Sequence, residues 1–472
     1  MVFNSRSFIH KPSWLVLPLV VLLLSLVLAN LIASESLPLL SVVFLCVCGV
    51  YLFSRHVECF IVLVLIINQE CFNLLPRPPA QWVYQDILFV LLPICWMATV
   101  LEKRQAIAGG AGRRYCDLIV ASLMGLTLLG IVNSSLAGQP VFMGVKAAKG
   151  YYLLLFYFVL SRSSVDFAKL TKFIVLAGLT LCVANNVQYI YWGEINLFHD
   201  SVWSERLGNL RFLNGDFFTI FAPLIALGEY VTNRKKGYLF ASLYMISTVA
   251  IQGQTRAVIF GLIGSSLVLL FASSNSLANK LKIVGGFSLA IVLSFIIWHD
   301  STLLGGLWDL STQEFSSNQG NIAIRLRGYG YYFTEFLKSP IWGGGIWSDQ
   351  VARSNPENIR QFHIVLSDLG ITAALFHFGS LGIAWLVATV VTSLFRLSCI
   401  LRKGAGPMDY GIVAYFVFAC LTSLTLNCFV DSRTIIYLAL AFAVIAYHDQ
   451  REVGELESNP YHKPTSVPLV KR

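Results

Sequence analysis

The chain has 472 residues, of which 56% are hydrophobic and 12% are charged. A soluble globular domain carries about 25% charged residues, so this composition excludes that class and favours an integral membrane protein. We attribute the net charge of +9 to membrane topology and to contact with anionic lipids, and we expect no nucleic-acid partner. The 10 cysteines lie almost all in apolar segments and form no CxxC pair, which argues against a disulfide framework or a metal site.

Apolar segments recur along almost the whole chain. A membrane span needs about 20 mostly apolar residues, and segments close to that length start near residues 14, 37, 57, 83, 117, 142, 167, 214, 237, 255, 279, 363, 410 and 432. The first, Trp14–Ala33, is too long for the core of a signal peptide and is predicted to be an uncleaved anchor. Only helices satisfy their backbone polar groups in lipid at these lengths, so the sequence predicts an all-α, polytopic transmembrane bundle of about 12–14 spans.

Two polar segments stand out from this pattern. A long loop over 299–362 separates Trp298 from His363 and is predicted to contain short helices. The tail over 449–472 is polar and contains Pro460, Pro464 and Pro468, a composition typical of disorder. The expected organisation is a single transmembrane domain over 1–448, followed by a disordered cytoplasmic tail.

The basic residues predict the orientation of the bundle. With the N-terminus inside, most of the 34 Lys and Arg residues fall in inner loops. In the short outer loops there are then only Arg77, Arg256 and Arg433. Because the excess of positive charge in short loops marks the cytoplasmic side, both termini are predicted to be cytoplasmic and the long loop to lie outside.

The outer basic residues are arginines, with Lys338 as the exception. They are Arg77, Arg206, Arg211, Arg256, Arg325, Arg327, Arg353, Arg360 and Arg433. Lysine and arginine orient membrane spans equally well, whereas the planar guanidinium of arginine is preferred for two-point contact with phosphate or carboxylate. The outer face is therefore predicted to hold an anion. The alternative is a structural role, in which the arginines contact loop carbonyls or outer acids such as Asp309, Glu314, Asp349 and Glu357.

Arg256 is the most constrained of these residues. The run Ile251–Arg256 joins two apolar segments with almost no loop between them. The arginine must then lie at the edge of the hydrocarbon or in a polar cavity, where it is costly without a partner. The alternative is that its side chain simply extends to the outer interface.

A second group precedes the segment that starts near 214. Arg206 and Arg211 lie in this stretch, and Arg211 and Asn214 are one helical turn apart, so the latter two could face one cavity. Ion pairs of Arg206 with Glu205 and of Arg211 with Asp216 explain the same residues equally well.

A third group lies in the second half of the long loop. Arg325 and Arg327 precede an aromatic, helix-like run from Tyr329 to Lys338. The following Ser339–Gly345 ends in three glycines and predicts a flexible turn that lets the backbone approach a ligand. Several aromatic residues here could stack on sugar rings or form an interfacial belt, namely Tyr329, Tyr331, Tyr332, Trp342 and Trp347.

His363 re-enters the membrane after the loop, and Asp368 follows five residues later. A histidine at the outer edge, near a carboxylate and arginines, is a candidate general base, although a structural role is the alternative. Lys146 and Lys149 share one face of the segment that opens at Phe142. They either extend to the interface or add positive charge to the same outer cavity.

The order of these features resembles the O-antigen ligase and O-antigen polymerase superfamily of bacterial envelope glycan synthesis. The resemblance covers about Asp117 to Tyr437. It rests first on Arg211–Asn214, at the start of the membrane segment near 214, and on Gln254–Arg256, which stands in place of the family's usual Ser-Arg-Gly-like turn. It rests also on Arg325 followed by Ser339–Gly343, and on His363 followed by Gly370, Gly379 and Gly382.

This resemblance implies a metal-independent, inverting membrane glycosyltransferase without a cofactor. The donor would be a glycan on undecaprenyl pyrophosphate, and the acceptor a glycan or lipid A-core. By position, Arg211, Arg256 and Arg325 would grip the diphosphate, with Arg206 and Arg327 beside them, and His363 would be the base. The enzyme would lie in the bacterial inner membrane with a periplasmic active face, and a chain-length regulator or other polysaccharide assembly proteins would be further partners.

The sequence departs from the ligase pattern after the histidine. Ile364 stands where a small polar residue is usual, and Gly379 and Gly382 come later than in ligases. The run Ser367–Gly370 is more similar to polymerase-type members, which makes Asp368 a rival base and favours an O-antigen or exopolysaccharide polymerase over a lipopolysaccharide ligase.

A secondary transporter or flippase for an anionic lipid or solute is the main alternative. It would need polar residues near mid-depth of the bilayer. The candidates are Asn68, Gln69, Glu70, Asn185, Asn186 and Gln188. A non-catalytic assembly scaffold is a third possibility, but it leaves the arginine preference unexplained.

Overall fold

A computed structural model describes most of the chain. It covers residues 37–69, 83–101, 111–192, 194–195, 197–198, 204–206, 209–273, 320–348, 369–431 and 433–458. Within these ranges, the side chains of 37–43, 83–86, 101, 111–113, 204–211, 216, 320–322, 403–404 and 449–458 are not described. The predicted segments that start near 14 and 279 lie outside these residues.

The first half of the described chain is entirely helical. Two breaks divide the predicted segment that starts near 142, so that it consists of an α-helix, a 3-10 helix and a second α-helix. The elements are α2 (Leu37–Arg55), α3 (Val57–Asn68), α4 (Val83–Leu101), α5 (Ala111–Leu136), α6 (Val141–Ala147), η2 (Lys149–Leu154), α7 (Leu155–Leu160) and α8 (Phe167–Ile190).

The second half adds one small hairpin to further helices. Its elements are β1 (Ser204–Arg206), β2 (Asn209–Arg211), α9 (Asp216–Asn233), α10 (Lys236–Thr248), the π-helix η3 (Val249–Gly253), α11 (Arg256–Ala272), α14 (Gly320–Lys338), α16 (Ile371–Gly404), α17 (Pro407–Thr422) and α18 (Ile435–Ser458). A helix thus occupies each predicted span that the structure describes, and the prediction of a helical fold is confirmed. Helix α14, of 19 residues, lies within the long polar segment, where short helices were predicted.

Several described helices have the length and apolar composition of membrane spans. Three qualify alone, and α6 with η2 and α7 forms a fourth candidate whose two parts are bent by 51°. The three are Arg114–Leu136, Phe167–Ile190 and Ile371–Arg402. Apolar helices of 10–17 residues surround them, including α3, α9, α11 and α17. These helices agree with the predicted membrane protein.

The centre of the bundle is the pair of helices α9 and α17, which run antiparallel. Gly228 of α9 lies so close to α17 that a β-carbon there would come 2.3 Å from the Pro407 carbonyl oxygen. Gly411 of α17 is equally close to Ile225. Phe221 then packs edge-on against Tyr415, with ring centroids 5.3 Å apart. Because α9 is apolar on all sides, it is buried by α8, α10, α11 and α17 together.

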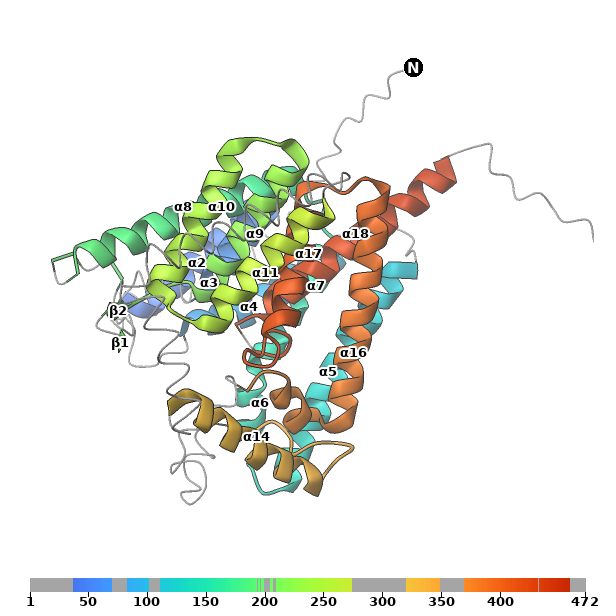
Figure 1. Cartoon of the computed structure of the whole chain (residues 1–472). Coiled ribbons are helices and arrows are strands. Elements are labelled where there is room, and N and C mark those ends of the chain that lie inside the picture. Colours follow the sequence, from blue (N-terminus) through green and yellow to red (C-terminus); the bar gives the residue numbers. More distant parts are fainter. Residues whose placement is uncertain are drawn as a thin grey trace, which may run out of the picture.

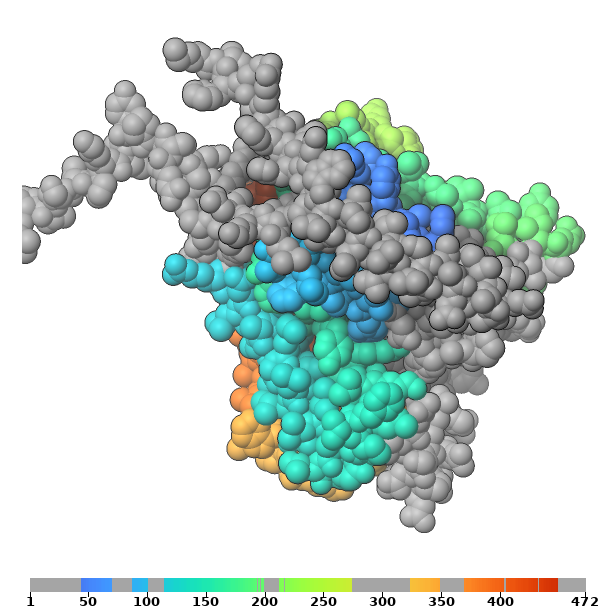
Figure 2. All heavy atoms as spheres, turned by 180° about the vertical axis from the view of Figure 1, so that it is seen from behind, coloured from blue at the N-terminus to red at the C-terminus, as the bar shows by residue number. Residues whose placement is uncertain are grey.

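Helix α16 carries a break near its start. Gly379 has φ 65° and ψ −152°, which interrupts the helix two turns after Ile371. The segment 339–345 fills this break: Ser380 N–H donates to the Pro340 carbonyl at 2.9 Å, and Gly344 N–H donates to the Phe376 carbonyl at 2.6 Å. Figure 1 shows α14 lying across the lower end of the bundle, next to the start of α16. From behind, α5 and the α6–α7 segment cover this part of the molecule (Figure 2).

Helix α18 extends beyond residue 448, where the tail was predicted to start. Helix α18 continues to Ser458, so residues 449–458 are helical, while 459–472 lie outside the described residues. The stretch from Gln450 to Glu457 is rich in Glu, Gln, Arg and Leu, which have high helix propensity, and it extends a helix that the core has already nucleated.

Candidate functional site

The turn between α17 and α18, residues 423–434, is where the polar ends of many helices meet. We call it the α17–α18 turn. Ile371 N–H of α16 donates to the Ser423 carbonyl at 2.8 Å, and the Tyr329 hydroxyl of α14 donates to the Leu424 carbonyl. A β-carbon on Gly370 would clash with the Ser423 carbonyl oxygen, and its φ of +55° also disfavours a side chain. The turn therefore lies at the end of the bundle that α14 crosses (Figure 1).

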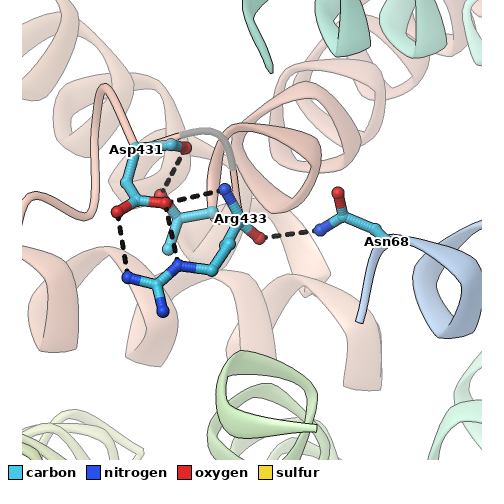
Figure 3. A network of polar contacts seen from close by, with 4 residues as sticks. Asn68, Asp431 and Arg433 are labelled. Carbon is cyan, nitrogen blue, oxygen red and sulfur yellow. Dashed lines mark hydrogen bonds and ion pairs between the residues drawn. The ribbon is translucent and has the colours of Figure 1, made fainter. Parts of the chain in front are cut away.

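Asp431 and Arg433 form the charged part of this turn (Figure 3). The Arg433 guanidinium donates to both Asp431 carboxylate oxygens at 3.2 Å, and Arg433 N–H donates to the carboxylate at 2.8 Å. The guanidinium also lies 5.4 Å from the centre of the Phe217 ring of α9. The Arg433 side chain is 45% exposed, so its guanidinium is accessible at the surface of the bundle although it is paired with Asp431.

The end of α3 adds buried amides beside Arg433. The Asn68 side chain donates to the Arg433 carbonyl at 2.8 Å (Figure 3). Asn68 Oδ1 and Gln69 Nε2 are buried and have no hydrogen-bond partner within the described part of the chain. Buried polar atoms are nearly always paired, so these two indicate a water or a polar ligand at this position.

A second set of amides connects α8, α9 and η3 at the same end of the bundle. Asn185 of α8 clamps Asn214: its amide donates to the Asn214 carbonyl at 3.1 Å, and its oxygen accepts from Asn214 N–H at 3.2 Å. Asn186 accepts from Gln252 at 2.7 Å and donates to Thr248 at 3.0 Å. The Gln188 oxygen accepts from Leu197 N–H at 2.6 Å. These amides, which the sequence suggested as mid-depth polar residues, hold together the chain segments that carry Arg211 and Arg256.

The predicted arginines of the second group lie on the hairpin. Ser204 pairs with Arg211, and Arg206 pairs with Asn209, in antiparallel register. Because alternate strand positions share a face, Arg206 and Arg211 occupy positions on the same face of the hairpin. Phe212, the residue after β2, donates its N–H to the Gln252 carbonyl of η3 at 3.1 Å. The structure thus brings the Arg211 and Arg256 segments into direct contact.

Arg256 is the first residue of α11, immediately after the π-helical turn. Gln254 has a left-handed backbone with φ 47° and is almost fully buried, and the Thr255 hydroxyl donates to the Gly253 carbonyl at 3.0 Å. The first turn of α11 contains no acidic residue. The half-buried Arg256 therefore lies at the positive end of a helix dipole, and both features favour a bound anion.

The start of α11 also lies close to the α17–α18 turn. A β-carbon on Gly261 would come 2.5 Å from Thr422, the last residue of α17. Arg256 precedes Gly261 by about one and a half helical turns, beyond the end of α17. The segments of Arg256 and Arg433 consequently border the same turn.

Arg325 and Arg327 lie on α14. Arg325 is half-buried and one turn before Tyr329, whereas Arg327 is exposed. Burial raises the pKa of Tyr329, and the positive charge of Arg325 acts in the opposite direction. Since Tyr329 contacts Leu424, Arg325 lies beside the α17–α18 turn. Tyr332 anchors the helix by packing on Phe376 of α16, with ring centroids 4.9 Å apart.

The bent segment α6–η2–α7 carries Lys146, Lys149 and Tyr151. The Lys149 ammonium lies 5.8 Å from the centre of the Phe89 ring of α4. Tyr151 is buried, and its hydroxyl lies 3.4 Å from His377 Nδ1 of α16. Tyr151 is also within range of electrostatic interaction with Asp431. The helix break thus turns Lys149 toward α4 and Tyr151 toward α16 and α18.

The glycine turn after Pro340 serves packing. A β-carbon on Gly343 would come 2.5 Å from the Gly379 backbone, and one on Gly345 would come 2.6 Å from the Ser134 backbone. Both glycines have positive φ. The predicted flexible turn is thus held between α5 and α16, and its glycines let backbone approach backbone.

The predicted site residues divide into those that the structure places and those that it does not. The hairpin of Arg206 and Arg211 is hydrogen-bonded to the turn that precedes Arg256, and Arg325 lies on the helix that contacts the α17–α18 turn. His363 and Asp368 lie outside the described residues. Sequence reasoning noted Arg433 only as an outer cation, and it missed the Tyr151–His377 pair because these residues are 226 positions apart.

The arrangement has the chemistry of an anion site on an apolar bundle. Among the described residues, no group of three or more His, Cys, Asp or Glu side chains has the geometry to hold a metal ion. No protein-family model matches the chain, and no curated protein matches it significantly. The interpretation of this site therefore rests on its residues and their geometry.

Proposed function

We propose that this protein is a membrane glycosyltransferase that transfers or polymerises a glycan carried on undecaprenyl pyrophosphate. One observation carries the proposal: Arg256, Arg325 and Arg433 lie on segments next to the α17–α18 turn of an apolar helical bundle, and the Arg206–Arg211 hairpin is hydrogen-bonded to the turn that precedes Arg256. A lipid diphosphate has the matching chemistry, since its anionic head needs cations and its tail needs an apolar surface.

The proposed chemistry needs few groups. A diphosphate is a good leaving group, so catalysis requires stabilisation of its developing charge and an oriented, deprotonated acceptor hydroxyl. We assign the grip on the diphosphate to Arg211, Arg256 and Arg325, with Arg206 and Arg327 beside them and Lys146 and Lys149 in support. His363 and Asp368 are the candidate bases that the resemblance suggests.

The proposed topology places the α17–α18 turn and helix α14 on the periplasmic side of the membrane. The excess of basic residues in the other loops supports cytoplasmic termini, about 12–14 spans in a bacterial inner membrane, and an outer loop over 299–362. The acceptor in this proposal is a glycan or lipid A-core, and a chain-length regulator is a further partner. The likeness of Ser367–Gly370 to polymerase-type members favours the polymerase form of the activity.

The experiment that tests the proposal is deletion of the gene, followed by gel analysis of the envelope glycans. Loss of a polymerase leaves single repeat units, whereas loss of a ligase leaves the finished polymer on its lipid carrier. An unchanged glycan pattern contradicts the proposal. A block in which complete lipid-linked units remain on the cytoplasmic face would instead identify the flippase alternative.

Complementation with an Arg256→Ala variant tests the site. We expect transfer to fall about 100–1,000-fold, as when one preorganised charge-stabilising donor is removed, while the protein remains in the membrane. Arg256→Lys keeps the charge but not the planar fork, so it should retain partial activity. The matched control is Arg402→Ala, an exposed arginine at the far end of the span Ile371–Arg402. Near-normal transfer by Arg256→Ala would remove this residue from the site.

A further inference from the structure

Three features of the structure lie outside the proposed arginine grip. An apolar cavity of about 210 Å³ lies between α4 and η2 and is lined by residues such as Phe89 and Tyr152. A buried pair of His448 and Asp409, 2.9 Å apart, lies at the opposite end of α17. The Tyr151–His377 pair lies next to the α17–α18 turn, and it is the one with the chemistry for the proposed reaction.

We infer that His377, held by Tyr151, is the general base that accepts the proton of the acceptor hydroxyl. This inference rests on the proposed function, and it assigns the role of base to a residue on α16 that no sequence motif singled out, in place of His363 and Asp368. Its starting point is the 3.4 Å contact of the Tyr151 hydroxyl with His377 Nδ1. A ring nitrogen held by one partner leaves the other nitrogen available, which is the arrangement of an oriented histidine base.

The backbone around His377 is fixed from two sides. Its neighbour Phe376 accepts from Gly344 N–H at 2.6 Å, and Ser380 N–H donates to the Pro340 carbonyl at 2.9 Å. The break at Gly379 makes this possible, because it frees the first two turns of α16 from the rest of the helix. The other neighbour, Phe378, packs edge-on against Tyr151 with ring centroids 5.7 Å apart. The imidazole is thus positioned by its neighbours on both sides of the chain.

Among the residues that the structure describes, the second ring nitrogen of His377 has no hydrogen-bond partner. Apart from Tyr151, the contacts of His377 within the described ranges are the aromatic rings of Phe376 and Phe378. The residue as a whole is half-buried, not fully enclosed. The titratable group that faces the imidazole is Tyr151 of η2. Beyond it lies Asp431 of the α17–α18 turn, which is paired with Arg433.

The proton transfer can be written in full. His377 Nδ1–H donates to the Tyr151 hydroxyl oxygen, which leaves the Nε2 lone pair free. Nε2 takes the proton of the acceptor hydroxyl while its oxygen forms a bond to the anomeric carbon of the donor sugar. The bond from that carbon to the diphosphate oxygen breaks, and the lipid diphosphate leaves with the electron pair. The imidazolium then returns its proton to water.

The test measures transfer by purified protein from a lipid-diphosphate-linked glycan, as a function of pH. Wild type should lose rate toward acid pH as the His377 imidazole becomes protonated and can no longer accept a proton. We call this loss of rate at low pH the acid limb of the profile. We expect His377→Gln to lower the rate about 100–10,000-fold and to abolish the acid limb. Tyr151→Phe, which keeps the packing, should lower the rate less and shift the limb. Added imidazole should restore part of the activity of His377→Ala.

The matched control is His448→Gln, since His448 is a half-buried histidine bonded to Asp409 at the other end of the bundle. It should keep both the rate and the acid limb. The inference is overturned if His377→Gln keeps both the wild-type rate and the acid limb. It is also overturned if the His377 variants lose activity that imidazole does not restore, while Tyr151→Phe leaves the acid limb unchanged. If wild type itself transfers no glycan while the deletion strain is normal, the proposed function fails, and the inference fails with it.

Discussion

The clamp between Asn185 and Asn214 offers the most direct test of how the site is assembled. Asn185 is fully buried, and its side chain forms two hydrogen bonds with the Asn214 backbone, at 3.1 and 3.2 Å. Asn185→Leu preserves the side-chain volume but removes both bonds. A buried backbone group left without a partner costs about 1–3 kcal/mol, so the loss of two is expected to cost about 2–6 kcal/mol.

The substitution should also act on function. Asn214 follows β2 and precedes α9, so the clamp fixes the chain segment that carries Arg211. We expect a lower unfolding midpoint of the detergent-solubilised protein, measured by heating followed by size-exclusion chromatography, together with reduced glycan transfer. The matched control on the same helix is Thr180→Val, because the exposed Thr180 hydroxyl donates to the Leu176 carbonyl of its own turn and, within the described ranges, to no other group. If Asn185→Leu is as stable as Thr180→Val, the clamp is not what holds this segment.

Three further predictions address the break in α16, the start of α8 and the metal requirement. Gly379→Ala places a β-carbon 2.4 Å from the Ile341 carbonyl oxygen at a φ of +65°, so we expect destabilisation by about 1–3 kcal/mol in the same heating assay; Gly125→Ala, where the added carbon meets nothing within 4 Å, is the control. Asp166 caps α8 by accepting from Lys169 and Ala168 N–H, so Asp166→Ala should cost about 1 kcal/mol. The Lys169 N–H bond lowers the pKa of Asp166, so this contribution is present above the ordinary Asp pKa and is lost as the pH falls through the lowered value; an Asp166→Ala penalty that is the same at acid and neutral pH would contradict this. Full transfer activity is expected in excess chelator, and restoration by magnesium or manganese after its loss would refute a metal-independent reaction.

The placement of helices followed from local properties of the chain. Apolar length alone predicted helices at the segments now seen as α2 to α11 and α16 to α18, because a helix satisfies its own backbone groups wherever the chain is apolar. The breaks did not follow in the same way. The 3-10 turn at Lys149 and the π-turn before Gln254 depend on what packs against them. Similarly, the helical start of the tail at residues 449–458 reflects its continuity with a buried helix more than its own composition.

For the candidate site, the sequence by itself determined which kinds of residue are present: arginines in place of lysines in the loops predicted to lie outside, and the amides predicted near mid-depth of the bilayer. Charge preference and hydropathy are properties of short stretches, so they can be read without a fold. Only the tertiary structure decided which of these stretches meet. It joined Asn68 to Arg433, and Tyr151 to His377, across hundreds of residues. The physical reason is that helices meet where their side chains fit, as at Gly228 against Pro407, and this complementarity depends on both partners at once.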